Sequence, residues 1–220
     1  MTSRDVSAIV LAGGRASRFG GPKLATPIEG VPLLHRAVLA VASVAVEVVV
    51  VAQPGEVPEL PPAPVPLRVA NDPVADGGPL VGLAAGLRAA AGAPALVVGG
   101  DMPRLSPTVL ALMLERLAAG DADAVILASP ATADDPVGRT GHPRQALPMA
   151  VRTGPALLAA DAALARGRHS LQAFLDALVV VELPAESWLR LDPSGGTLDD
   201  VDEPADVDRL DRALIDPSGT

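Results

Sequence analysis

Short apolar runs alternate with helical patterns along most of this chain. The runs are rich in valine, leucine, isoleucine or alanine and lie within residues 8–11, 44–52, 67–70, 95–98, 123–129, 145–152 and 178–183. The helical patterns lie at residues 31–42, 80–90, 107–119, 154–165, 170–177 and 204–214. Strands that alternate with helices build βαβ units, in which helices cover both faces of a parallel sheet. The pattern therefore predicts an α/β fold, a three-layer α/β/α arrangement with a mostly parallel central sheet.

A proline-rich segment, residues 53–66, interrupts this alternation. Proline has no backbone N–H and is excluded from helix interiors and central strands, so the segment is expected to be an extended surface connection. A linker between two domains is the alternative, but the same alternation resumes on the other side. We therefore expect one domain over residues 1–220, with residues 216–220 as a tail.

Composition excludes several classes of function. Apolar residues make up 49% of the chain and aromatic residues 1%, namely Phe19, Phe174 and Trp188, and the net charge is −9. A strongly acidic chain with so few stacking side chains argues against a nucleic-acid partner. The absence of cysteine excludes disulfides and thiolate metal sites. No signal peptide and no apolar run of about 20 residues is visible, so we expect a cytoplasmic protein without a membrane partner.

The most informative stretch for function is residues 8–23, AIVLAGGRASRFGGPK. A buried strand pattern opens there into a loop with four glycines and three cations, namely Gly13, Gly14, Gly20 and Gly21 with Arg15, Arg18 and Lys23. Glycines let backbone N–H groups approach an anion, and fixed cations among them suit a polyphosphate. Lys23 is the only lysine of the chain. The loop therefore predicts nucleotide phosphate binding, and an ordinary surface arginine loop is the alternative.

Carboxylates follow other predicted strands. Asp72 lies in a second glycine-rich loop after residues 67–70, and Asp101 directly follows the run at residues 95–98. In parallel sheets, ligands bind beyond the carboxyl ends of the strands, so both aspartates are expected near the first glycine loop. Asp101 suits Mg²⁺, and a turn aspartate is the alternative. Asp200 and Asp202 form a further acidic pair before the last helix, where Asp202 as an N-cap is the alternative.

The first loop fits neither the Walker pattern, since Leu24 follows Lys23, nor Gly-x-Gly-x-x-Gly. Four motifs in this order do resemble one family: LAGGRASRFGGPK, GGPLVGL, GGDMPRL and DDVDEPADV. They resemble the molybdenum cofactor guanylyltransferase family of MobA-like nucleotidyltransferases, and the resemblance covers nearly the whole chain. It implies a Rossmann-like fold and transfer of GMP from GTP to molybdopterin, with Mg²⁺ and release of pyrophosphate.

The resemblance also implies roles for particular residues. Residues 1–105 would mainly bind the nucleotide and residues 106–215 mainly the acceptor. Lys23, Arg18 and Asp101 would be catalytic, with Asp101, and Asp202 as a second candidate, holding the metal. Asp200 and Asp202 are the candidates for acceptor binding. The nucleotide would be contacted by Leu11, Ala12, Gly13, Gly14, Lys23, Asp72 and Asp101. Transient contact with enzymes that receive the molybdenum cofactor is the remaining expected partnership.

Three positions depart from the family pattern. Pro22 precedes Lys23 where the family usually has aspartate, Val51 stands where an asparagine is typical, and residues 200–204 read DVDEP instead of Asn-x-Asn-Thr-Pro. Related cytidylyltransferases tend to end the first loop with Pro-Lys. A molybdopterin cytidylyltransferase, or another NTP transferase with a different acceptor, is therefore one alternative. A nucleotide-binding regulatory domain without catalytic activity is the other.

Overall fold

The structure is a computed structural model that describes residues 5–13, 19, 21–130 and 144–215, and the side chains up to residue 210. A seven-stranded sheet forms its centre, in the order β5-β4-β1-β6-β8-β7-β9. The strands are β1 (Ser7–Leu11), β4 (Glu47–Ala52), β5 (Leu67–Asn71), β6 (Pro94–Gly99), β7 (Ala124–Leu127), β8 (Met149–Arg152) and β9 (Val180–Leu183). Only β8 runs antiparallel to its neighbours within this sheet. The predicted mostly parallel sheet is therefore confirmed.

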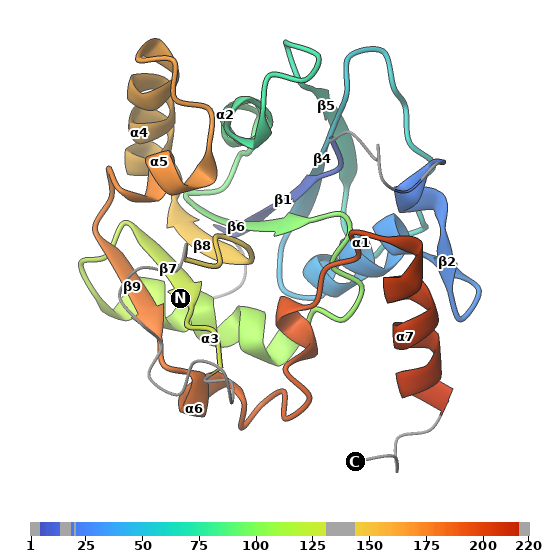
Figure 1. Cartoon of the computed structure of the whole chain (residues 1–220). Coiled ribbons are helices and arrows are strands. Elements are labelled where there is room, and N and C mark those ends of the chain that lie inside the picture. The colour runs from blue at the N-terminus through green and yellow to red at the C-terminus, as the bar shows by residue number, and fades with distance from the viewer. Residues whose placement is uncertain (1–4, 14–18, 20, 131–143, 216–220) are drawn as a thin grey trace.

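Helices cover both faces of the sheet (Figure 1). One face carries α1 (Leu33–Ala42), α3 (Pro107–Ala119) and the short α6 (Ala185–Trp188). The other carries α2 (Pro79–Ala89), α4 (Thr153–Ala165) and α5 (Leu171–Leu175). Successive strand residues point to opposite faces, so Val10 packs among residues of the first layer and Ile9 among those of the second. Both residues are fully buried, and the predicted α/β/α layering is confirmed.

Helix α2 lies close to the sheet because it carries glycine on its inner face. A β-carbon added to Gly86 would lie 2.5 Å from Ile9 Cγ2 and 3.0 Å from Val51 Cγ2. The absence of a side chain at Gly86 therefore permits this close approach.

A two-stranded hairpin, β2 (Pro27–Ile28) and β3 (Val31–Pro32), precedes α1. The sequence pattern predicted a helix from residue 31, which is wrong, because α1 begins at Leu33. Glu29 and Gly30 both have positive φ, at 49° and 77°, which is the backbone of a tight hairpin turn. The last helix, α7 (Pro204–Ile215), lies beside this hairpin (Figure 1), and its Leu210 packs against Ile28 and Leu33.

Other boundaries differ from the sequence pattern by a few residues. Strand β4 begins at Glu47 instead of residue 44, because the chain turns after α1 through a Val44 N–H bond to the Val41 carbonyl. Strand β8 occupies only the second half, Met149–Arg152, of the run within which a strand was expected. The helix α6 and the 3-10 turns η2 (Lys23–Ala25) and η3 (Gly196–Leu198) were not predicted. Residues 53–66 form no helix or strand, as expected for a connection. None of the described helices is long and apolar enough to span a membrane.

Candidate active site

The carboxyl ends of three neighbouring strands meet at one edge of the sheet. Leu11 at the end of β1 lies in register with Val51 of β4 and with Gly99 of β6. The chain continues this pairing past the strands, since Ala12 N donates to Val51 O at 2.8 Å and Gly100 N donates to Leu11 O at 3.0 Å. Ala12 and Gly13, the start of the first glycine loop, therefore leave the sheet beside Gly100 and Asp101. This confirms the expected shared edge.

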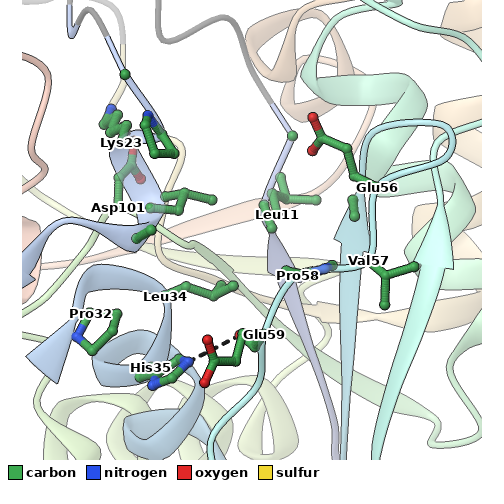
Figure 2. A pocket seen from close by; sticks show the side chains of 17 residues that line it. Leu11, Lys23, Pro32, Leu34, His35, Glu56, Val57, Pro58, Glu59 and Asp101 are labelled. Carbon is green, nitrogen blue, oxygen red and sulfur yellow. Dashed lines mark hydrogen bonds and ion pairs between the residues drawn. The ribbon is translucent and has the colours of Figure 1, made fainter.

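Lys23 contacts Asp101 at this edge (Figure 2). Its Nζ donates to Asp101 Oδ2 at 2.8 Å and to Asp202 Oδ1 at 3.3 Å, although Asp202 is 179 residues away in sequence. The Lys23 side chain is only 14% exposed. Burial opposes its charge, but the hydrogen bonds and charges of Asp101 and Asp202 outweigh burial and raise the Lys23 pKa. Lys23 is therefore a fixed cation at neutral pH.

The acidic segment before α7 is tied to the same edge. Val201 is fully buried, and its N–H donates to the backbone carbonyl of Asp101 at 3.0 Å. This bond places Asp200 and Asp202 beside Asp101. Partial burial and the charges of Asp202 and Asp101 raise the pKa of Asp200, against the attraction of Lys23. Asp101, Asp200 and Asp202 thus surround one lysine, and the carboxylates repel one another.

The structure does not support the alternative interpretation of Asp202 as the N-cap of α7. The backbone N–H groups of Asp202 and Glu203 both donate to Asp206 Oδ2, each at 2.9 Å. Asp206 therefore accepts from the two N–H groups just before α7, while the Asp202 side chain accepts from Lys23.

A polar network that the sequence pattern did not indicate supports this segment. Arg104 Nη1 bonds Asp199 Oδ2 at 3.0 Å, and Thr197 donates its N–H and its hydroxyl to Asp192 Oδ2, both at 2.7 Å. Thr197 Oγ1 also accepts from the N–H of Ser106, at 3.1 Å, just before α3. An ion pair and a hydrogen bond therefore connect the segment after Asp101 to the segment before Asp200. Arg104 and Asp199 are 95 residues apart, and Ser106 and Thr197 are 91 residues apart, so only their nearness in space could have identified these pairs.

Two hollows open at this edge of the sheet, and the first is lined by Lys23 and Asp101. The larger, of about 630 Å³, runs from Lys23 and Asp101 past Leu11 towards Leu34 and His35 of α1, as Figure 2 shows. Its far wall is the proline-rich segment, where His35 Nε2 lies 3.0 Å from the Glu59 carbonyl oxygen.

The second hollow, of about 520 Å³, lies on the α2 side and shares Leu11 and Gly13 with the first. It is lined by Leu11, Gly13, Val51, Gln53, Asp72, Asp76, Gly78, Pro79 and Gly82. Asp72 is 6% exposed, and its Oδ1 accepts from Val74 N at 3.0 Å. Asp72 therefore belongs to this hollow and lies outside the cluster around Lys23.

The predicted site residues are thus distributed over one connected region. Lys23, Asp101 and Asp202 are in direct contact, with Asp200 beside them. Leu11, Ala12 and Gly13 line the larger hollow. Gly14 and Arg18 lie outside the described residues. Among the described residues, no three carboxylates or imidazoles are arranged to hold a metal ion by themselves. A metal at Asp101 would need further ligands from phosphate or water.

An open α/β sheet with charged side chains and adjoining hollows at its carboxyl edge is the architecture of nucleotide-binding enzymes. Comparison with known proteins makes this class specific. Residues 8–181 match the MobA-like NTP transferase domain, so the chain belongs to that family and is a nucleotidyltransferase.

Relatives match over nearly the whole chain. A probable molybdenum cofactor guanylyltransferase of Chloroflexus aggregans is 32% identical over 207 residues, covering 92% of this chain and 91% of the relative. A protein of the same description from Natronomonas pharaonis is 30% identical over 212 residues, covering 94% of this chain and 96% of the relative.

Solved structures share the fold. The molybdopterin-guanine dinucleotide biosynthesis protein A of Archaeoglobus fulgidus aligns with a TM-score of 0.70 at 20% identity, over 95% of this chain and 98% of that one. The 4-diphosphocytidyl-2C-methyl-D-erythritol synthase of Anaerococcus prevotii aligns with a TM-score of 0.68 at 16% identity, over 97% and 99% of the two chains.

Proposed function

We propose that this protein transfers GMP from GTP to the phosphate of molybdopterin and releases pyrophosphate in the cytoplasm. The observation that carries the proposal is the Lys23–Asp101 contact at the carboxyl edge of the sheet, in the wall of the larger hollow. The relatives described as guanylyltransferases, which match nearly the full chain, support the choice of nucleotide and acceptor.

The reaction requires little acid–base chemistry from the protein. A phosphate oxygen of the acceptor attacks the α-phosphorus of GTP, one P–O bond forms there, and the bond to the bridging oxygen breaks. Pyrophosphate leaves with that electron pair. Because the attacking phosphate is already anionic, no general base is needed, and catalysis comes from positioning and charge neutralisation. Lys23, with Arg18 of the first loop, stabilises the charge of the departing pyrophosphate.

The residues present fit a divalent metal ion, which nucleotidyltransferases generally use. Asp101 keeps 29% of its side chain exposed at the sheet edge, and Asp200 and Asp202 add negative charge beside it. Mg²⁺ prefers one or two carboxylates together with phosphate oxygens and water. Asp101, with Asp202 as a second ligand, would hold Mg²⁺, which supplies charge neutralisation on the phosphate oxygens.

The second hollow suits a guanine base. Guanine presents an amino group and a ring N–H side by side, and one carboxylate can accept from both. Asp72 Oδ1 accepts one backbone bond, which leaves acceptor capacity on this carboxylate, and Asp76 and Gln53 line the same hollow. The path from Asp72 past Leu11 and Gly13 to Lys23 then follows the nucleotide from its base to its phosphates.

The acidic segment before α7 adjoins Asp101, because the Val201 N–H donates to the Asp101 backbone carbonyl. Asp200 is the proposed contact for the amino and ring N–H groups of the pterin, and Asp202 is a second such contact if it is not a metal ligand. Both lie in the half of the chain, residues 106–215, that is proposed to serve mainly the acceptor. Enzymes that receive the finished cofactor are the proposed transient partners.

A cytidylyltransferase is the second candidate, and Pro22 before Lys23 favours it. A regulatory domain that binds nucleotide without turnover is the third. The presence of both Lys23 and Asp101, the proposed leaving-group and metal contacts, argues against that third candidate.

A panel of nucleotides distinguishes the candidates. Pyrophosphate release is measured with GTP, CTP, ATP or UTP, each with and without molybdopterin, and with Mg²⁺ or a chelator. We expect turnover with GTP that depends on both molybdopterin and Mg²⁺. Preference for CTP would support the cytidylyltransferase, and GTP binding without turnover would support the regulatory domain.

The Asp101→Asn variant should require a much higher Mg²⁺ concentration for turnover, whereas Asp161→Asn, on the outer surface of α4, should behave as the wild type.

A further inference from the structure

We propose that His169 is a positioning residue for the nucleotide base: it fixes the turn at Gly77 and Gly78, which borders the hollow beside Asp72. This inference rests on the proposed function only in taking that hollow as the base site. It applies to whichever nucleotide the enzyme uses.

His169 contacts the turn through its side chain and its backbone. Its Nδ1 lies 2.6 Å from the carbonyl oxygen of Gly77, and since a carbonyl only accepts, Nδ1 carries the proton and donates. Its own carbonyl oxygen accepts from the N–H of Leu80 at 3.2 Å. The two bonds hold the residues on either side of Gly78 and Pro79, and both of these line the hollow.

The bond to Leu80 replaces a missing helix cap. Leu80 is in the first turn of α2, where backbone N–H groups have no partner within the helix. Gly78 precedes that turn and makes no side-chain cap. His169 therefore takes over a capping role from a segment 89 residues further along the chain.

Gly78 is packed against His169 as well. It has a φ of 90°, a conformation that favours glycine, and an added β-carbon would lie 3.1 Å from His169 Cβ and 3.2 Å from its carbonyl oxygen. On its other side, the turn is held by the bond from Gly77 N to Val74 O at 3.1 Å, next to Asp72. A shift of His169 therefore reaches the wall of the hollow directly.

His169 is itself held from both sides. The end of α4 is closed by Gly167, with a φ of 71°, and by a bond from Arg168 N to Ala163 O at 3.0 Å. The start of α5 is capped by Ser170, whose side chain accepts from Ala173 N at 3.2 Å. His169 is nevertheless exposed to solvent, so its replacement should change the turn without removing packed core volume.

The test compares His169→Ala, His169→Asn and wild type with each nucleotide of the panel. Losing one hydrogen bond should raise the nucleotide KM and Kd about three- to tenfold, with kcat nearly unchanged. The preference for the cognate base, measured as a ratio of kcat/KM values, should fall with it. Asparagine should restore both, because its side-chain N–H₂ can donate from a position similar to Nδ1. Unfolding temperatures should remain close to wild type.

Gln172→Ala is the matched control. Gln172 also donates a side-chain bond from this part of the chain to a backbone carbonyl, that of Arg144, but it does not line the hollow. The proposal is overturned if His169→Ala leaves KM and base preference unchanged, or if Gln172→Ala changes them equally. Turnover of wild type with a base other than guanine would contradict the proposed function alone, and the variants are then compared on that nucleotide. Absence of any nucleotide binding by wild type would overturn both.

Discussion

Lys23 is both unique in the sequence and held by two carboxylates in the structure. It is the only lysine of the chain, and it is held mostly buried between Asp101 and Asp202, which come from distant parts of the sequence. A compact ammonium group can bond both carboxylates and still be offered to a phosphate. Its raised pKa keeps it charged through the whole neutral range. These features make Lys23 the residue most directly responsible for the proposed chemistry.

We expect Lys23→Ala to lower turnover by about 10²-fold or more, because a fixed positive charge at the leaving group is lost. Pyrophosphate release at saturating GTP measures the loss, and circular dichroism checks that the fold is retained. Arg88→Ala is the matched control, since it also removes a cation paired with an aspartate, Asp161, but at an exposed site on the outer layer. Near-normal turnover of Lys23→Ala would contradict the assignment.

At the scale of elements, the fit between α2 and the sheet sets the position of the second hollow. Gly86 contacts Ile9 and Val51 in the sheet, and Gly82 of the same helix lines the hollow. The carboxyl end of β4 and the first turn of α2 therefore face each other across the proposed base site. The distance between α2 and the sheet thus sets the width of the proposed base site.

Gly86→Ala should lower the free energy of unfolding by about 1–3 kcal/mol, because the added methyl group meets the β-branched side chain of Ile9 at 2.5 Å. Gly154→Ala offers the comparison within α4, since nothing lies within 4 Å of its added β-carbon. That variant should be neutral or more stable by up to about 1 kcal/mol. Urea unfolding measures both, and equal effects of the two substitutions would refute the packing explanation.

At the scale of the whole molecule, carboxyl groups at the two ends of the sheet have pKa values shifted in opposite directions. At the carboxyl edge, burial and the repulsion of the carboxylates of Asp202 and Asp101 raise the pKa of Asp200. At the opposite end, Glu47 is 8% exposed and accepts from Ser7 Oγ at 2.6 Å, Ala91 N at 2.7 Å and Arg68 Nη2 at 2.5 Å. Carboxylates that repel one another thus lie where a ligand is proposed to bind. A carboxylate whose hydrogen bonds are all made within the protein lies at the opposite end, where it serves stability.

Glu47 should make the stability depend on pH in acid. Burial opposes its charge, but the bonds from Ser7, Ala91 and Arg68 outweigh it and hold the Glu47 pKa below the usual 4.5. Its contribution is therefore complete above about pH 4.5 and is lost as the pH falls through the lower pKa of the folded state. Glu47→Gln should be less stable at pH 7, by about 1–3 kcal/mol, and should lose less stability below pH 4.5.

Chemical unfolding between pH 3 and pH 7 measures this dependence. Glu115→Gln, on the exposed side of α3, is the control and should keep the pH profile of the wild type. A Glu47→Gln profile parallel to that of the wild type would show that Glu47 does not titrate as described.

The parts of the site that were predictable lie directly after strands. Asp101 and the first glycine loop follow apolar runs, and the rule for parallel sheets then places them at one edge. Asp72 was predicted at the same edge, but its place in the second hollow depends on the path of the loop before α2. Arg104 and His169 carried no recognisable pattern, because their partners, Asp199 and Gly77, lie 95 and 92 residues away.

The sequence by itself determined the layers, most of the strands and the order of the chemical groups along the chain, because buried runs and helical periodicity are local properties. It also singled out as candidates Lys23, the only lysine, at the end of the first glycine loop, and Asp101, directly after a strand. Only the tertiary structure decided that Asp202 reaches Lys23, that β8 runs against its neighbours, and that His169 holds Gly77 beside the proposed base site. These are contacts between specific polar groups of distant segments, and no local pattern encodes which distant partner a loop residue will meet.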